Sequence, residues 1–302
     1  MPGRTIKYLR RGEIDTTRWD QCISTASNGL VYAYSFYLDH MSRHWDALVM
    51  GDYEAVMPLT WNRKWGISYL YQPAFTASLG VFGNGLTKER VLRMLDAIPK
   101  KFRLIEIELN KDNVFDFGFP LRNNFVLDLA RPYEDISAGY NDNLRRNLKK
   151  ASAQQLRYET NIDPDLVLTI SEDANRSNYK TSDFKRFSQL CNYLCQRNEA
   201  LACGVFTEEN ELAASALFFF SHHRAYYILV GNPAGKRIEG ASHFLIDRFI
   251  ATHAGRNMLL DFEGSDIEGL ANFYGSFGAQ AEQYASLRIN RLPWWVKLIK
   301  GN

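Results

Sequence analysis

Cysteine, net charge and long apolar runs are all scarce in this sequence of 302 residues. The four cysteines are too few and too unevenly spaced for a disulfide framework, so we expect reduced thiols at Cys22, Cys191, Cys195 and Cys203. The formal net charge of +2 does not point to nucleic acids or anionic membranes as partners of the whole chain, so any basic site must be local. No apolar run approaches the roughly 20 residues of a membrane span, and the N-terminus lacks a signal-type core. We therefore expect a cytoplasmic protein without stable membrane insertion.

Aromatic residues, in contrast, are plentiful. The sequence is 46% hydrophobic and 14% aromatic, which is typical of a folded protein and favours a large β-sheet. The chain is long enough for one large domain or for two domains of about 150 residues each. A second domain is therefore the first feature to look for.

Two stretches of the first half match stretches of the second half at one common spacing. The segment "RLIEIELN" from Arg103 aligns with "MLLDFEGS" from Met258, and "WDALVM" from Trp45 aligns with "ALACGV" from Ala200. Both halves then show the same order of two helices, an antiparallel meander, a glycine-containing loop, a helix and a strand. We interpret the chain as a tandem repeat.

The repeat predicts an α+β chain of two domains with one fold, each a mixed, mostly antiparallel sheet flanked by helices. The predicted boundaries are 1–135 for the first domain, 136–157 for a basic interdomain helix and 158–302 for the second domain. Each half is expected to close its own sheet with a last strand. These strands are "FVLDL" from Phe125 and "YASLRIN" from Tyr284.

This order of elements resembles the acyl-CoA N-acyltransferase fold of the GNAT superfamily. The tandem arrangement, the basic segment "NLRRNLKKA" between the halves, and "DFEGS" followed by "GLANFYGSFGA" resemble Fem-type (FemAB-like) peptidoglycan-bridge aminoacyltransferases. The resemblance covers nearly the whole chain in architecture but only these two stretches at motif level. It implies two tandem GNAT-like domains and an acyltransferase, although a fold alone does not fix an activity.

The resemblance also implies a donor-binding loop. GNAT enzymes bind the pyrophosphate of coenzyme A with the pattern R/Q-x-x-G-x-G/A at a helix start, where free amides and the helix dipole favour anions. The matching stretch is "RIEGAS". The resemblance therefore implies that the donor is bound by Lys236, Arg237, Gly240 and Ser242. Acetyl-CoA or another acyl-CoA is the implied donor, whereas Fem-type relatives take an aminoacyl group from tRNA. Alternatively, Gly240 only permits a turn and Ser242 caps the helix.

The predicted strand that begins near Met258 ends in two carboxylates. Alternation puts Asp261 and Glu263 on one face, where each would raise the pKa of the other toward the range of a base that accepts an amine's proton. The resemblance implies a catalytic carboxylate in this part of the sheet, and Tyr274 on the following helix would protonate the leaving group. Alternatively, both acids pair with arginines or cap the next helix, for which Ser265 is also well placed.

The segment "DNLRRNLKKASAQQ" is the strongest charge cluster of the sequence. A helix would gather four cations on one broad face, because Arg145 and Lys149, like Arg146 and Lys150, are four residues apart. Such a self-repelling face favours an anionic partner such as aminoacyl-tRNA or a nucleotide-linked precursor. A solvated linker helix is the alternative.

Other candidates carry weaker signals. Tyr71 and Gln72 are expected to line a cleft between the domains, together with Ser265, although packing at a strand end explains the first two almost as well. His40 and His44 are one helical turn apart, but no third ligand converges on them in sequence, so we expect no metal site.

We therefore expect an acyl or aminoacyl transferase that moves an acyl group from a thioester or aminoacyl-tRNA donor to an amine. The acceptor would be a peptide, a cell-wall precursor or a small molecule. Direct attack by the amine is expected, since no cysteine or serine stands out as a covalent nucleophile. The alternatives are a coenzyme-A-dependent N-acetyltransferase of a small amine or peptide, and a non-catalytic binding module.

Overall fold

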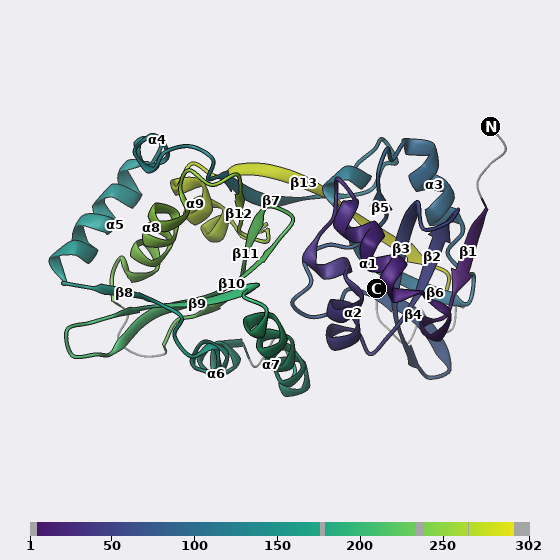
Figure 1. Cartoon of the computed structure of the whole chain (residues 1–302), viewed down its shortest axis with the longest axis horizontal. Helices are drawn as coiled ribbons and strands as arrows, with labels where there is room; N and C mark the ends of the chain where they lie inside the picture. Colours follow the sequence, from purple (N-terminus) through teal and green to yellow (C-terminus); the bar gives the residue numbers. More distant parts are fainter. Residues whose placement is uncertain (1–4, 176–178, 234–237, 265, 293–302) are drawn as a thin grey trace. The chain divides into compact units, whose positions relative to one another are not determined.

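The computed structural model describes residues 5–175, 179–233, 238–264 and 266–292. The chain forms two compact units (Figure 1). The first unit contains Met1–Arg122 and Gln283–Asn302, and the second contains Asn123–Glu282. Each unit is built on a mixed β-sheet with helices packed against it. None of the helices in the described ranges is long and apolar enough to cross a membrane.

The sheet of the first unit has the strand order β1-β2-β3-β4-β6-β13, with the short β5 paired to β3. Neighbouring strands are antiparallel except for β4 and β6, which are parallel. The strands are β1 (Ile6–Leu9), β2 (His44–Met50), β3 (Ala55–Lys64), β4 (Ile67–Tyr71), β5 (Phe82–Gly83), β6 (Phe102–Leu109) and β13 (Gln280–Asn290). The parallel pair requires a crossover, and helix α3 (Lys88–Asp96) makes it.

Two helices of the first unit, α1 (Thr16–Thr25) and α3, begin after residues with capping side chains. The side chains of Asp15 and Thr87 accept hydrogen bonds from the first turns of α1 and α3. Helix α2 (Ser35–Met41) follows α1, and the 3-10 turns are η1 (Arg11–Glu13), η2 (Val31–Ala33) and η3 (Lys111–Asn113). The apolar stripe of α3 is buried in the core cluster that includes β2, β3 and β6, through Val91, Met94 and Leu95.

The sheet of the second unit has the strand order β8-β9-β10-β11-β12-β7. Strands β11 and β12 are parallel, and the other neighbours are antiparallel. The strands are β7 (Leu121–Asp128), β8 (Arg157–Thr160), β9 (Ala200–Phe206), β10 (Leu212–Ser221), β11 (Arg224–Gly231) and β12 (Leu259–Asp261). The crossover between the parallel strands is helix α8 (Ala241–His253).

Helices cover both faces of this second sheet. Helix α8 contacts β9 and β10, while α6 contacts β10 and β11. Figure 1 shows α8 and α9 on one side of these strands and α6 and α7 on the other. The remaining bounds are α4 (Tyr133–Ala138), α5 (Asp142–Ala153), α6 (Pro164–Asn175), α7 (Thr181–Gln196) and α9 (Glu268–Ser276).

The predicted fold class is confirmed, but the predicted closing strands are wrong. Both units have an antiparallel meander, a crossover helix, a parallel strand and a last antiparallel strand. However, β7 pairs with β12 of the second unit, and β13 pairs with β6 of the first. Each sheet is therefore completed by a strand from the other half of the sequence. Periodicity shows that a strand exists but not which edge it joins, because pairing is non-local.

Candidate functional site

The strand β12 ends earlier than the sequence alternation predicts. Its last residue is Asp261, and Glu263 and Gly264 both have positive φ, at 61° and 83°. Two successive left-handed residues turn the chain, so the prediction that Asp261 and Glu263 share a strand face is wrong. In the first unit, β6 instead continues as a strand through the matching residues Glu106 and Glu108.

Asp261 lies in a buried ion pair with Arg224. The Nη1 atom of Arg224 is 2.6 Å from Oδ2 of Asp261, and the two residues are only 7% and 4% exposed. Arg224 also contacts Glu282 at 3.1 Å. Burial disfavours the charged guanidinium, but the two carboxylates outweigh it and raise the pKa of Arg224 above its ordinary value. The arginine pairing considered as the alternative is thus observed for Asp261.

The other oxygen of Asp261 is also occupied. Its Oδ1 accepts hydrogen bonds from the side-chain amide of Asn124 and from the backbone N–H of Glu263, both at 2.9 Å. The carboxylate therefore ties β12 to β7 and fixes the turn at Glu263. With both oxygens engaged, Asp261 is a positioning residue in our interpretation, and its predicted catalytic role stays a prediction.

Glu263 lies close to two tyrosines. Burial, together with the negative charge of Glu263, raises the pKa of Tyr274 to about 12. The same two causes, burial first, raise the pKa of Tyr179. Both phenols are therefore protonated at neutral pH, as a group that donates a proton to a leaving atom must be. The charge of Glu263 therefore acts on Tyr274 and also on Tyr179, which the sequence did not suggest. The predicted catalytic roles of Glu263 and Tyr274 stay predictions.

Tyr274 is also part of the core. Its ring stacks on Phe262 at 4.6 Å and lies 6.0 Å from Phe125, and the residue is 6% exposed. The aromatic residues of α9 therefore have a structural role that needs no catalytic explanation. Their packing also holds the Tyr274 hydroxyl in one place.

Gly240 is required by close packing at the start of α8. It has φ of 81°, and a Cβ atom there would lie 2.4 Å from the carbonyl oxygen of Asn147 in α5. This supports the turn-permitting alternative for Gly240. The Ser242 hydroxyl hydrogen-bonds to Asn232 at 3.3 Å, and no side chain caps α8, so the capping alternative is not observed. Lys236 and Arg237 lie outside the described residues.

The basic helix α5 lies directly beside this loop. Lys150 forms an ion pair with Glu239 at 2.9 Å, and the Gln154 side chain donates to the Glu239 carbonyl at 3.2 Å. The two motifs that the sequence analysis treated separately therefore meet at the N-terminus of α8. A helix N-terminus with adjacent cations is a favourable environment for an anionic ligand.

The sequence predicts that the four cations of α5 share one free face. The structure does not show such a face, because two of the four side chains have partners. Arg145 folds back and donates to the carbonyls of Tyr140 and Ala138, at 2.9 and 2.8 Å. Within the described ranges, Arg146 and Lys149 are exposed and have no ion pair. These two side chains are the ones available to an anion.

The cleft-lining candidates Tyr71 and Gln72 make local hydrogen bonds in the first unit. The Tyr71 hydroxyl accepts from the backbone N–H of Arg43 at 3.1 Å. The Gln72 side chain donates to the Thr76 carbonyl at 2.8 Å and accepts from the Glu108 backbone at 3.1 Å. The packing alternative therefore has direct support, and their role in a cleft stays a prediction. Ser265 lies outside the described residues.

Arg224, Asn124, Glu282 and Tyr179 were missed by the sequence analysis. Only Arg224 gave a signal, as a charged residue that opens the apolar run "RAYYILVG". The other three come from distant segments: folding brings Asn124 to Asp261, Tyr179 to Glu263 and Glu282 to Arg224.

The sequence matches no family model and no curated protein. Solved structures are similar in fold. FemX has a TM-score of 0.64 and 12% identity, over 97% of this chain and 99% of its own. A conserved protein of unknown function from Bacteroides thetaiotaomicron has a TM-score of 0.59 and 14% identity, over 93% of this chain and 99% of its own.

A third similar structure is the C-terminal domain of a protein named as a lysylphosphatidylglycerol synthetase, from Agrobacterium fabrum. Its TM-score is 0.51 and its identity 11%, over 95% of this chain and 94% of that one. At such low identity these similarities show the fold alone. The chain shares its fold with FemX and with this synthetase domain, as the Fem-type resemblance in the sequence predicts.

Proposed function

We propose that this protein is an acyl or aminoacyl transferase that acts on an amine, with its chemistry in the second unit. The observation that carries the proposal is the position of Glu263. Its left-handed backbone turns it out of the end of β12, and its charge acts on the nearby Tyr274. A residue other than glycine in the left-handed backbone conformation costs free energy. Such strained residues are found most often at functional sites.

The proposed donor loop leads into α8, and α8 packs against α9, the helix that carries Tyr274 beside Glu263. His243, in the first turn of α8, lies 4.8 Å from the Phe273 ring, and Phe273 is 5.7 Å from Tyr274. Packing through α9 therefore links the start of α8 to the Glu263–Tyr274 pair. A donor whose phosphates bind at the start of α8 would have its acyl group directed toward these side chains.

These positions support the following reaction. The amine nitrogen attacks the carbonyl carbon of the donor and forms a C–N bond, and Glu263 takes the proton that the nitrogen loses. The bond from the carbonyl carbon to the donor sulfur or oxygen then breaks, and Tyr274 gives its proton to that leaving atom. Asp261 and Arg224 hold the turn that presents Glu263.

Both candidate donors carry phosphates. Arg146 and Lys149, exposed on α5 beside the loop, would contact the phosphates of acyl-CoA or of aminoacyl-tRNA. Neutralising both in Arg146→Gln/Lys149→Gln should weaken binding of the true donor and flatten its salt dependence. The matched control is Lys185→Gln/Arg256→Gln, which removes two charges elsewhere on this unit.

The test combines donor binding with transfer. Acetyl-CoA and aminoacyl-tRNA are titrated separately by calorimetry, and acylated products from a panel of amines are detected by mass spectrometry. Glu263→Gln should lower the transfer rate by about 10²- to 10⁴-fold with unchanged donor binding. The control Glu268→Gln, an exposed acid on α9, should keep full activity.

The outcomes separate the candidates. Binding of acetyl-CoA without aminoacyl-tRNA identifies a coenzyme-A-dependent N-acetyltransferase, and the reverse identifies a Fem-like aminoacyltransferase. Binding of neither donor indicates a non-catalytic module. Unchanged transfer in Glu263→Gln rules out the proposed base.

A further inference from the structure

One end of the first unit's sheet gathers the ends of several strands. His44 pairs with Trp61, so the start of β2 lies beside the end of β3. Ser68 pairs with Phe102, so β6 begins at the same end as the β3–β4 turn. The end of β1 joins them, since Leu9 pairs with Ala47. We refer to this end of the sheet as the basic end, because many of its residues are arginine or lysine.

The basic end carries a dense set of exposed cations, from four different segments. They are Arg10, Arg43, Arg63, Lys64, Lys100, Lys101 and Arg103. Three acids at this end have partners: Asp39 is paired with Arg11 at 2.7 Å, Asp46 with Tyr8 and, at 3.8 Å, with Lys101, and Glu13 accepts the backbone N–H of Arg10 at 2.7 Å. In the described part of the chain, Arg10, Arg43, Lys64, Lys100 and Arg103 have no ion pair. This local charge contrasts with the nearly balanced whole chain.

A strained tryptophan projects from the basic end. Trp65 is 73% exposed and has φ of 50°, and Gly66 follows with φ of 78°. They are the two central residues of the β3–β4 turn, which the pair Lys64 and Ile67 closes. Such turns favour Asn-Gly, and a bulky aromatic residue in the left-handed region costs stability. A tryptophan there is unfavourable for the isolated fold.

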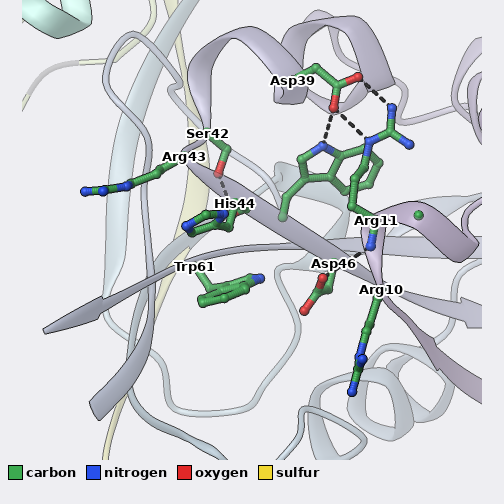
Figure 2. A pocket seen from close by; sticks show the side chains of 10 residues that line it. Arg10, Arg11, Asp39, Ser42, Arg43, His44, Asp46 and Trp61 are labelled. Carbon is green, nitrogen blue, oxygen red and sulfur yellow. Dashed lines mark hydrogen bonds and ion pairs between the residues drawn. The ribbon is translucent and has the colours of Figure 1, made fainter. Parts of the chain in front are cut away.

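A cavity opens at the same end (Figure 2). Its volume is about 350 Å³, and its lining includes Arg10, Arg43, His44 and Trp61. The His44 ring stacks on Trp61 at 4.6 Å, and Arg10 and Arg43 extend to either side of that pair. The Trp61 indole N–H has no hydrogen-bond partner in the described part of the chain. The lining also includes Asp39 and Asp46, but hydrogen bonds from Arg11, Trp45 and Tyr8 engage their carboxylates. The cations without an ion pair, Arg10 and Arg43, therefore suit the cavity to a small anionic group such as a phosphate.

We propose that the basic end docks on an anionic lipid surface, with the Trp65 indole inserted at headgroup level. Tryptophan is favoured at membrane interfaces, and each Lys or Arg near an anionic surface strengthens binding about fivefold. The cavity then receives one headgroup phosphate between Arg10 and Arg43. A single exposed indole at the tip of a turn suits the headgroup layer of a lipid surface, where tryptophan is enriched. The docking surface lies wholly in the first unit and does not depend on the proposed transferase activity.

Vesicle co-sedimentation of the full chain tests the proposal. The protein should bind vesicles of phosphatidylcholine mixed with phosphatidylglycerol, not phosphatidylcholine alone, and added salt should weaken binding. Trp65→Asn should lower binding about tenfold and raise the melting temperature, because asparagine fits the turn. Vesicle binding should also fall tenfold or more in each of two double variants, Arg63→Gln/Lys64→Gln and Arg10→Gln/Arg43→Gln.

Matched controls separate docking from general charge effects. Lys7→Gln/Lys88→Gln removes two cations elsewhere on the same unit, and Leu92→Gln removes an exposed apolar side chain; both should bind as the wild type does. Equal binding to both vesicle types, or no binding, overturns the proposal. So does retention of binding in Trp65→Asn. Tighter binding to unacylated tRNA, lost in the same variants, would assign the surface to nucleic acid instead. Loss of binding in Trp65→Asn with a raised melting temperature supports the lipid surface, since misfolding cannot explain it.

Discussion

Arg224 and Asp261 form an ion pair at 2.6 Å that is almost fully shielded from solvent. Arg224 begins β11 and Asp261 ends the parallel strand β12, two positions apart in register. Asp261 also accepts a hydrogen bond from the backbone N–H of Glu263. The pair thus connects the sheet core to the turn that presents the candidate base.

Replacing Asp261 by asparagine should destabilise the second unit. The substitution keeps the shape but leaves the buried Arg224 with only the partly exposed Glu282, so we expect a loss of about 3 kcal/mol in unfolding free energy. Urea denaturation measures it. Glu282→Gln serves as the comparison and should cost about 1 kcal/mol, and equal losses in the two variants would contradict the central role of Asp261.

Glu263→Asn should show a trade-off between stability and activity. Asparagine tolerates the left-handed conformation better than glutamate, so the melting temperature should rise by a few degrees. Transfer should be lost, because the amide cannot accept a proton. A variant that is both less stable and inactive would show that Glu263 is chiefly structural.

Gly240→Ala should disrupt the contact between α5 and α8. The new Cβ would lie 2.4 Å from the Asn147 carbonyl, and φ of 81° is unfavourable for alanine, so we expect a loss of at least about 2 kcal/mol. Gly275→Ala on α9 is the matched control, since its Cβ would meet nothing within 4 Å. It should stabilise the helix by about 0.5 to 1 kcal/mol. Thermal denaturation followed by circular dichroism compares the two.

Alkaline conditions should unfold the second unit over a defined pH range. Burial, with the charge of Asp247, raises the pKa of Tyr133 to about 12, and burial, with Glu263, does the same for Tyr274. Because the folded pKa exceeds the ordinary value of 10.0, the stabilisation is complete below pH 10 and is lost as the pH rises toward 12. Unfolding free energies between pH 8 and about 12 test this, with phenolate absorbance as a second readout.

Tyr133→Phe is the companion variant for that experiment. The Tyr133 hydroxyl donates to the buried Asp247 at 2.7 Å. Its removal should lower stability at neutral pH by about 1 to 2 kcal/mol and reduce the alkaline slope. An unchanged slope would show that other groups cause the alkaline loss.

Several parts of the fold and site were predictable from local pattern. The order of elements predicted a helix between the glycine-containing loop and the acidic strand of each half, and the structure has α3 at Lys88–Asp96 and α8 at Ala241–His253. The motif around Glu263 and Tyr274 was found because its charges and aromatics are unusual in a strand and a helix. The roles of these residues remain predictions.

Other features were not predictable because they depend on contacts between distant segments. The end of β12 at Asp261 follows from the turn at Glu263, which strand alternation does not show. Asn124 and Arg224 reach Asp261 only through the pairing of β7, β12 and β11. The same applies to Asn147, whose carbonyl explains Gly240.

The sequence by itself determined which segments become helices and strands, the α+β class and the resemblance to the Fem-type fold, because periodicity and capping act over a few neighbouring residues. Tertiary structure alone decided that each sheet takes its last strand from the other half, that Asp261 is neutralised by Arg224, and that α5 lies against the start of α8. Strand pairing, buried charge and close packing all depend on residues that are far apart in the chain, so no local pattern encodes them.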